Sequence, residues 1–387
     1  MLEYGEEQDF KYIVSIKVIG VGGGGNNAVK HMLNSDMKGI DFWVANTDSQ
    51  SLSSFSKENR IYLGQNLTKG LGAGAVPEIG RKAAEESEDA IKTALRGADM
   101  VFIAAGMGGG TGTGAAPVVA RYAKEMGAVV VGIVTKPFGF EGKKRMQQAL
   151  QGIENMRPYV DTIVIVPNDK LLETIGNNTT YLEAFKEADN VLRRGVQGIS
   201  EIISLPGLVN VDFADVKTVL QNKGTALMGI GVASGPNRAV EAARLAISSP
   251  LLEVDINGAT DAIVQITSDV DITMREVEDV IAEIRSASST EIDIIHGTGF
   301  NLDLEGEVVV TVIATGFDQT AKKMREVESE ADYRNPYESV RPTYVSQPQE
   351  PRYTSGNTYS QPTYNQQPTQ PQQQESKVPS WLKNRFK

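Results

Sequence analysis

The stretch GMGGGTGTG at residues 106–114 constrains the fold more than any other part of this sequence, because it places six glycines within nine residues. A glycine inside regular structure typically costs about 0.5–1 kcal/mol relative to alanine. Such a stretch is favoured where the backbone turns sharply or where another group comes very close to it. It follows the apolar run ADMVFIAAG, which predicts a buried strand, and precedes a helix that we expect to begin near Ala115.

Two further glycine-rich segments show the same arrangement. Residues 20–29 (GVGGGGNNAV) follow a predicted strand and open a predicted helix, and residues 70–80 (GLGAGAVPEIG) place Pro77 where the first helical position is expected. Gly20, Gly22 and Gly25 match the G-x-G-x-x-G pattern of dinucleotide-binding Rossmann domains, although four consecutive glycines satisfy many patterns. A tight strand–helix turn without a ligand is the simpler alternative for this segment taken alone.

The first two glycine segments differ in number and in sequence from the phosphate-binding loops of Rossmann domains and of P-loop proteins. A Rossmann domain has a single pyrophosphate loop, and a P-loop requires Gly-Lys-Ser/Thr, whereas neither residues 20–29 nor residues 106–117 contain lysine. Backbone N–H groups and helix N-termini would then bind the phosphates, with Thr111 and Thr113 adding hydroxyl donors. Several such loops at the carboxyl ends of parallel strands predict a site for a nucleoside triphosphate.

Apolar runs rich in Val and Ile alternate with helical segments from residue 11 to about residue 167. This alternation predicts an α/β fold with a parallel-sheet nucleotide-binding domain and helices on both faces of the sheet. Residues 181–205 predict one long central helix, because their apolar residues mostly recur at helical spacing. A second alternation predicts a smaller α/β C-terminal domain that ends near Phe317.

The composition changes abruptly after residue 334. Residues 335–374 contain no Leu, Ile, Met, Phe or Trp, so they cannot bury enough apolar surface to offset the entropy of ordering. We therefore predict a disordered tail. The predicted parts of the chain are an N-terminal extension (1–11), the nucleotide-binding domain (12–180), the central helix (181–205), a loop and helix (206–223), the C-terminal α/β domain (224–317), a mostly disordered linker (318–376) and a C-terminal peptide (377–387).

Composition excludes several classes of chemistry. The chain has no Cys, which excludes disulfides, thiolate metal sites and Cys nucleophiles, and only His31 and His296 could supply imidazole, so we expect no protein metal centre. The net charge of −11 disfavours binding to nucleic acid or to anionic lipid. The apolar runs are far shorter than the ~20 residues that a membrane span needs, and the acidic N-terminus does not resemble a signal peptide. We expect a cytoplasmic protein without direct membrane insertion.

Three pairs of residues allow both a structural and a functional interpretation. Glu141 and Arg145 are four residues apart and could form only a surface ion pair, worth about 0.2–0.5 kcal/mol. Asp212 and Asp215 could cap the N-terminus of a helix, because Asp-x-x-Asp resembles a capping box. The third pair lies on the predicted central helix.

That third pair is Phe185 and Asp189, which could be a core residue and a solvated edge residue. The functional interpretation is base recognition, because an aromatic face can stack on a base. A carboxylate accepts hydrogen bonds from N1–H and the N2 amino group of guanine, whereas adenine presents an acceptor at N1 and would leave the charge unpaired.

The C-terminal peptide KVPSWLKNRFK could be a frayed end, which is common for termini. However, Leu382 and Phe386 are four residues apart beside Trp381, with Lys and Arg around them. This pattern also fits a short amphipathic helix that docks in a partner's groove.

The sequence GMGGGTGTG is the signature of the tubulin superfamily, and the chain resembles the bacterial cell-division GTPases of the FtsZ family within it. The resemblance extends from Ser15 to Phe317 and returns in the last eleven residues. Two positions depart from the family pattern: Val76 stands where Asn is common, and Gly139 where Thr or Asn is common. The other matching segments are IKVIGVGGGGNNAV, ANTDSQ, KPFGFEGKKR, IVPNDKLL, EAFKEADNVLRRGVQGIS and NVDFADVKTVL.

The resemblance implies that residues 12–180 bind GTP or GDP, with Mg²⁺ expected beside GTP, and that residues 206–223 form a catalytic loop and helix. The catalytic residues that it implies are Asn210, Asp212 and Asp215, which would act on the GTP of a neighbouring subunit. The nucleotide-binding residues that it implies are Gly23, Gly24, Gly25, Asn26, Asn27, Gly109, Gly110, Thr111, Gly112, Glu141, Arg145, Asn168, Phe185 and Asp189.

The resemblance also implies head-to-tail homopolymers that organise the division ring at mid-cell. The peptide from Lys377 to Lys387 would bind membrane adaptors and regulatory division proteins. Two alternatives remain open from the sequence: an NAD-dependent oxidoreductase of the Rossmann type, and a structural filament that does not hydrolyse its nucleotide.

Overall fold

The computed structural model describes residues 14–317 except residues 36, 38, 175–178, 205–210 and 253–255. Within these ranges, no helix combines the length and the hydropathy that crossing a bilayer requires. The predictions that lie outside the described residues concern Asn210, the N-terminal extension (1–11), the linker (318–376) and the C-terminal peptide (377–387).

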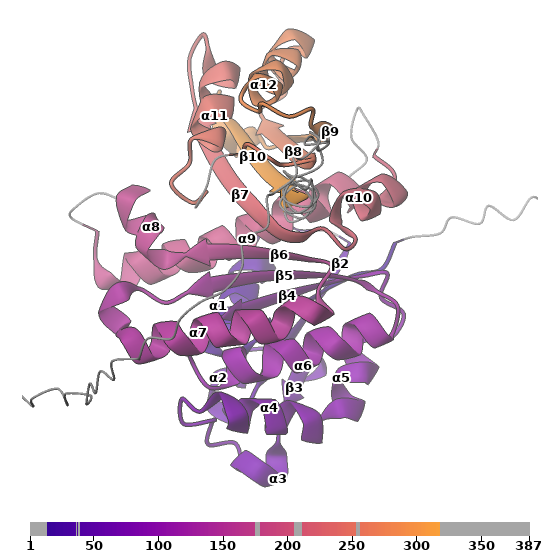
Figure 1. Ribbon diagram of the computed structural model, residues 1–387, viewed down its shortest axis with the longest axis vertical. Coiled ribbons are helices and arrows are strands. Elements are labelled where there is room, and N and C mark those ends of the chain that lie inside the picture. Colours follow the sequence, from indigo (N-terminus) through magenta and orange to yellow (C-terminus); the bar gives the residue numbers. More distant parts are fainter. Residues whose placement is uncertain are drawn as a thin grey trace, which may run out of the picture. The chain divides into compact units, whose positions relative to one another are not determined.

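The first half of the chain forms a parallel sheet, as predicted (Figure 1). Its strands lie in the order β3-β2-β1-β4-β5-β6. Because Val21 pairs with Ala105 and Gly106 pairs with Thr135, strands β1, β4 and β5 end at the same edge of the sheet. The strand bounds are β1 Ile16–Val21, β2 Ile40–Asn46, β3 Arg60–Tyr62, β4 Met100–Gly106, β5 Val129–Lys136 and β6 Thr162–Pro167.

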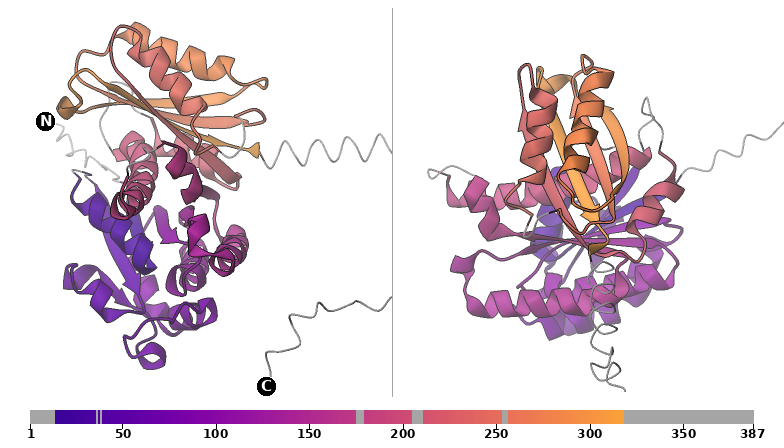
Figure 2. Two further views of the ribbon diagram at one scale, coloured as in Figure 1. Left: turned by 90° about the vertical axis from the view of Figure 1, so that its left-hand side faces the viewer. Right: turned by 45° about the horizontal axis from the view of Figure 1, so that its top comes forward.

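Helices cover both faces of this sheet, as Figure 2 shows from two further sides. One apolar core lies between the sheet and helices α4 to α7, and another lies between the opposite face and helices α1, α9 and α10. The helices of this half are α1 Gly22–Leu33, α2 Ser49–Leu52, α3 Gln65–Thr68, α4 Pro77–Glu86, α5 Glu88–Leu95, α6 Thr111–Glu125, α7 Lys143–Met156 and α8 Asn168–Thr174. Short 3-10 helices lie at Lys57–Asn59, Gly139–Glu141 and Arg157–Tyr159.

Two helix starts test the sequence predictions. Pro77 occupies the first position of α4, which confirms that prediction. The helix predicted to begin near Ala115 is α6. That predicted start is wrong, because α6 already begins at Thr111 and includes Gly112 and Gly114. Close packing of this first turn against other loops, described below, overrides the weak helix propensity of glycine.

The long central helix is α9, Tyr181–Ser204, and it is followed by α10, Phe213–Leu220. The rest of the chain forms the smaller α/β unit that the second alternation predicts. In this unit β10 is antiparallel to both β7 and β8, and β8 is parallel to β9. Its elements are β7 Gly224–Ala233, α11 Arg238–Ile247, β8 Asp261–Ser268, α12 Met274–Ser286, β9 Asp293–Phe300, a 3-10 turn at Leu302–Leu304 and β10 Val308–Thr315.

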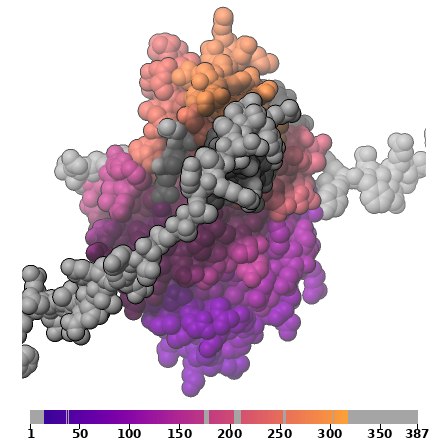
Figure 3. Space-filling model, viewed as in Figure 1, coloured from indigo at the N-terminus to yellow at the C-terminus, as the bar shows by residue number. Residues whose placement is uncertain are grey.

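Strand β7 belongs to both halves of the molecule. Its first residues pair with β6, from Thr162 with Gly224 to Val164 with Ala226, and the residues from Leu227 onward pair with β10. The ten strands therefore form one continuous sheet in the order β3-β2-β1-β4-β5-β6-β7-β10-β8-β9. In space filling, the orange C-terminal unit lies against the magenta part of the first half, and the indigo part lies at the opposite end of the view (Figure 3).

Candidate functional site

The N-termini of two helices meet at one edge of the sheet. Helix α1 begins directly after β1, and α6 begins a short turn after the neighbouring strand β4. The first N–H groups of a helix have no partner within the helix and favour an anion. The predicted nucleotide-binding residues at these two N-termini are Gly23, Gly24, Gly25, Asn26 and Asn27 on α1, and Gly109, Gly110, Thr111 and Gly112 at the start of α6.

Most of the glycines at this edge are required by contacts between backbone segments. A Cβ atom on Gly22 would lie 2.7 Å from the backbone nitrogen of Gly112, so the first two glycine segments are in close contact. A Cβ on Gly110 would lie 2.8 Å from Cβ of Ala73, in the third segment. By contrast, a Cβ on Gly23 or on Gly109 would meet no atom within 4 Å. The three segments therefore interlock, and these two glycines face open space in which phosphates could lie.

Polar side chains fix the shape of the glycine segments. The side chain of Asn26 is buried, and its amide, when oriented to satisfy both of its groups, donates to the carbonyls of Gly20 (2.8 Å) and Gly22 (3.0 Å). The hydroxyls of Thr47 and Thr111 lie 2.7 Å apart and share a hydrogen bond. Asn27, by contrast, is exposed at the open side of α1. Asn26 thus holds the loop itself, whereas Asn27 is accessible to a ligand.

The carboxylate of Asp189 lies beyond these loops, on α9. Its side chain is 15% exposed, and Nε2 of His31 lies 3.9 Å from its Oδ2. Burial in these surroundings raises the pKa of Asp189 to about 7. A ligand that donates hydrogen bonds to this carboxylate would stabilise its ionised form and so offset the cost of burying it.

Two more predicted residues lie near this helix. The ring of Phe185 packs against Phe138 and Tyr181, with centroids 5.1 and 4.9 Å apart. Asn168 begins α8 and is buried, and its Oδ1 has no hydrogen-bond partner in the described part of the chain. An unpaired buried acceptor is costly, so a donor from a bound ligand would satisfy it. The acceptors on Asn168 and Asp189 and the ring of Phe185 fit a nucleoside whose base presents N–H donors.

Glu141 and Arg145 form the ion pair that the spacing suggests. Glu141 also accepts a hydrogen bond from the backbone nitrogen of Phe138 at 2.9 Å, so it holds the turn before α7. In the same turn, the nitrogen of Gly139 donates to Oδ1 of Asp169 at 2.7 Å. Asp169 is a residue that the sequence analysis missed, although the quoted segment IVPNDKLL contains it. A Cβ on Gly139 would lie only 3.3 Å from its Oδ2.

Asp212 and Asp215 are not brought to this edge of the sheet. Asp212 is the N-cap residue of α10, but its side chain makes no capping hydrogen bond, and both carboxylates are exposed. The other end of α10 lies at the start of β6, where Leu220 accepts a hydrogen bond from Thr162. A strand of this length spans about 20 Å, and α8 and α10 lie at its opposite ends (Figure 1).

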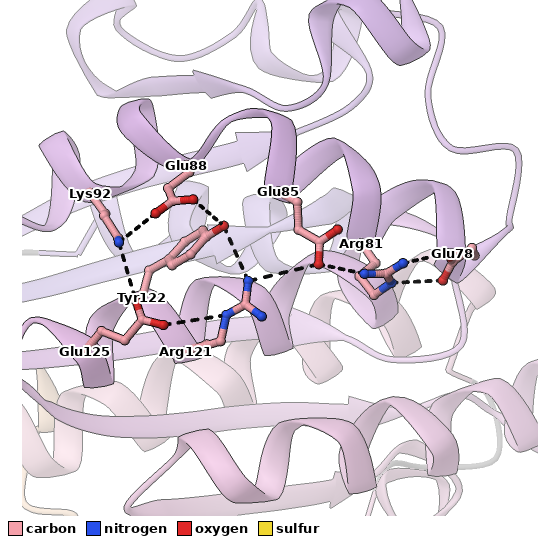
Figure 4. A network of polar contacts seen from close by, with 8 residues as sticks. All are labelled: Glu78, Arg81, Glu85, Glu88, Lys92, Arg121, Tyr122 and Glu125. Carbon is pink, nitrogen blue, oxygen red and sulfur yellow. Dashed lines mark hydrogen bonds and ion pairs between the residues drawn. The ribbon is translucent and has the colours of Figure 1, made fainter.

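A groove of about 660 Å³ lies elsewhere, between helices α4, α6 and α7. Its polar wall is a network of ion pairs in which Arg81 joins Glu78 and Glu85, and Arg121 approaches Glu85 and Glu125 (Figure 4). Hydrogen bonds from Arg81 lower the pKa of Glu78 to about 2. The arginines of this wall are paired with carboxylates, and the network ties α4 to α6.

Comparison with known proteins supports the nucleotide site. Residues 15–176 match the model "Tubulin/FtsZ family, GTPase domain", and residues 224–318 match "FtsZ family, C-terminal domain". The first match favours a GTPase over a dinucleotide-binding interpretation of residues 20–29.

Solved structures give the same result. The chain is similar to an FtsZ dimer from M. jannaschii, with 44% identity over 79% of this chain and 89% of that one and a TM-score of 0.77. A GDP-bound monomer of CetZ1 from Haloferax volcanii is 22% identical over 82% of this chain and all of that one, with a TM-score of 0.68, and so shares the fold. A GTPgS-bound protofilament of CetZ2 from that organism is 21% identical, with a TM-score of 0.65. By sequence and by fold, this chain belongs to the FtsZ family of tubulin-like GTPases.

Proposed function

We propose that this protein is a self-assembling GTPase whose head-to-tail filaments organise the bacterial division ring at mid-cell. One observation carries the proposal: helix α10, which begins with the exposed carboxylates of Asp212 and Asp215, is held at the opposite end of β6 from the glycine segments. A subunit cannot bring both ends of its own sheet to one phosphate. A second copy, stacked end to end, can.

The glycine edge binds GTP in this proposal. Backbone N–H groups around Gly23 and Gly109 hold the phosphates, with the hydroxyl of Thr111 beside them. Asp189 accepts from N1–H and the N2 amino group of guanine, and this gives selectivity against adenine. The remaining contacts to base, ribose and phosphates come from Asn27, Glu141, Arg145, Asn168 and Phe185. Mg²⁺ bound with GTP would neutralise charge on the β- and γ-phosphates.

Hydrolysis takes place between subunits. The first two glycine segments, residues 20–29 and 106–117, contain no titratable side chain, so a base must come from elsewhere. Asp212 and Asp215 of the neighbouring subunit, together with Asn210, position and polarise the attacking water. The side chain of Asp212 makes no capping hydrogen bond to α10, so its carboxylate is available for this role.

Exposed apolar side chains around the nucleotide edge support the stacking of subunits. Phe140, Tyr181 and Leu182 are 60%, 69% and 64% exposed, and the first two rings lie 5.7 Å apart. Contact between this edge and the α10 end of another copy is heterologous, and repeated contacts of that kind generate filaments. The similar structures from M. jannaschii and Haloferax volcanii include a dimer and a protofilament.

The residues from Lys377 to Lys387 connect the filament to its partners in this proposal. They carry basic residues around Trp381, Leu382 and Phe386, and they bind membrane adaptors and regulatory division proteins. We expect a chain without these residues to keep its GTPase activity and to lose recruitment to adaptor-coated membranes.

Mixing two inactive variants tests the shared site. Asp212→Ala keeps its own glycine edge but provides no catalytic carboxylate to its neighbour. Gly109→Val keeps Asp212 but directs a side chain into the open space beside α6, without the collisions that a side chain on Gly110 would cause. In a random equal mixture, about a quarter of the interfaces contain both intact parts, so up to about a quarter of wild-type GTPase activity should return.

The matched control replaces Gly109→Val with the double variant Gly109→Val/Asp212→Ala, which should restore nothing. Sedimentation of each mixture checks that both variants enter the same filaments. If they co-sediment and the activity stays at the sum of the two separate activities, Asp212 does not act across an interface. Phosphate release by the wild type separates a GTPase from a structural filament that does not hydrolyse GTP.

A further inference from the structure

Two buried threonine hydroxyls bind the last carbonyl groups of α10. Oγ1 of Thr162 donates to the carbonyl of Leu220, and Oγ1 of Thr315 donates to the carbonyl of Val219 at 2.9 Å. Both threonines have an exposed fraction of 0%. The final carbonyls of a helix have no partner within the helix. These two hydroxyls therefore help to hold the C-terminal end of α10 in place.

The two hydroxyls come from different halves of the molecule. Thr162 is the first residue of β6, in the nucleotide-binding half, and Thr315 is the last residue of β10, in the C-terminal half. The turn after α10 is held by the first half as well, because the nitrogen of Asn222 donates to Oδ1 of Asp161 at 3.3 Å. Lys124 forms an ion pair of 2.7 Å with the same oxygen. The end of α10 is thus fixed at the point where both halves meet.

The opposite end of α10 carries the carboxylates of the proposed catalytic loop. Asp212 precedes the helix, Asp215 lies in its first turn, and both are exposed. Asp212 is about 12 Å along the helix axis from Leu220, so a tilt of about 10° at the fixed end would move it by about 2 Å. A misplacement of about 1 Å can reduce a rate by about 100-fold.

We propose that Thr162 and Thr315 are positioning residues: their hydroxyls set the direction of α10 and so place Asp212 and Asp215 against the GTP of the neighbouring subunit. This inference rests on the proposed hydrolysis between subunits. It also gives β6 two roles, because its first residue orients α10 while the residue after its end, Asn168, lies at the subunit's own nucleotide edge.

The test replaces each hydroxyl by a methyl group of the same shape. Thr162→Val, Thr315→Val and the double variant should bind GTP with wild-type affinity and should pellet as filaments. Their kcat should fall, by roughly 3- to 10-fold for each single variant and further for the double variant, with KM unchanged. Thr162→Ser and Thr315→Ser retain the hydroxyl and should recover most of the activity. Each single variant keeps one of the two hydrogen bonds, so folding can be preserved even if the double variant unfolds.

The matched control is Thr311→Val, on the same strand as Thr315. Thr311 is also buried, but its methyl group faces Gly198 of α9, where a Cβ on that glycine would lie 3.1 Å away. This control should keep its kcat within about twofold, as expected for a substitution that leaves α10 in place.

Mixing locates the defect. In an equal mixture with Gly109→Val, Thr162→Val should give more GTPase activity than the sum of the two variants assayed separately at the same concentrations, because the intact α10 of the second variant faces the intact nucleotide edge of the first. If Asp212→Ala also fails to complement Gly109→Val, the proposed hydrolysis between subunits is wrong. If that pair complements and Thr162→Val does not, the positioning role is wrong. Unchanged kcat in the double variant, or a fall in activity that appears only as a raised KM for GTP, would equally overturn it.

Discussion

At the scale of single residues, the proposed contact between Asp189 and guanine predicts that nucleotide affinity depends on pH. Its pKa of about 7, raised by burial, means that a proton competes with guanine for the carboxylate near neutral pH. Guanine requires the ionised form, so acid weakens binding. For a pKa of about 7, the ionised fraction falls about tenfold between pH 8 and pH 6, and GTP affinity should fall by a similar factor.

Fluorescence or filter binding across this pH range measures the effect. Asp189→Asn is the control, because any pH dependence that remains in it belongs to the phosphates or to other groups. His31→Gln is the second control, since Nε2 of His31 lies 3.9 Å from the carboxylate. A wild-type affinity that is flat from pH 8 to pH 6 would show that Asp189 does not bind the base through its ionised form.

At the scale of single elements, helix α4 lacks an N-terminal cap. Val76 occupies its N-cap position with extended backbone (φ −108°, ψ 109°), and no side chain bonds to the first N–H groups. This geometry suits Asn, and a polar N-cap typically stabilises a helix by about 1 kcal/mol. Val76→Asn should therefore raise the free energy of unfolding by about that amount, measured by urea denaturation. Val76→Ala is the control, and a gain in Ala equal to that in Asn would exclude capping as the cause.

A structural feature can be predicted from the sequence when residues close together in the chain determine it, and it cannot when contacts between distant residues do. The strands and most helices follow from local apolar patterns, and Pro77 locates the start of α4 correctly. The dual pairing of β7 could not be predicted, because its partners β6 and β10 are chosen by tertiary packing. The same applies to the start of α6 at Thr111, where contact with other glycine segments outweighs local propensity.

The candidate site shows the same limit. The sequence identified glycine-rich segments and acidic residues, but it did not distinguish glycines that face a ligand from glycines that packing requires. The structure shows that Gly110 and Gly114 are required by packing against the α4 segment, whereas Gly109 faces open space. The desolvation of Asp189 and the hydroxyls that bind α10 also depend on residues far apart in the chain.

At the scale of the whole molecule, the separation of the glycine edge from α10 predicts that GTPase activity depends on assembly. GTPase activity per subunit should be low at high dilution, rise as filaments form, and then reach a plateau. Phosphate release measured against protein concentration checks this, with Asp212→Ala as the control that stays near zero throughout. Activity per subunit that is constant down to high dilution would contradict a site completed by a second copy.

The position of α10 at the far end of β6 has a consequence for the ends of a filament. In the proposed filament, every subunit presents its nucleotide at one end and its carboxylates at the other, so the filament has a direction and its two terminal subunits differ. One terminal subunit holds GTP that no neighbouring carboxylates reach, and the carboxylates of the other terminal subunit face no GTP. Such a filament therefore has one fewer catalytic site, made of a nucleotide edge and a neighbour's carboxylates, than it has subunits. The GTP that stays unhydrolysed identifies the end at which the nucleotide edge is exposed.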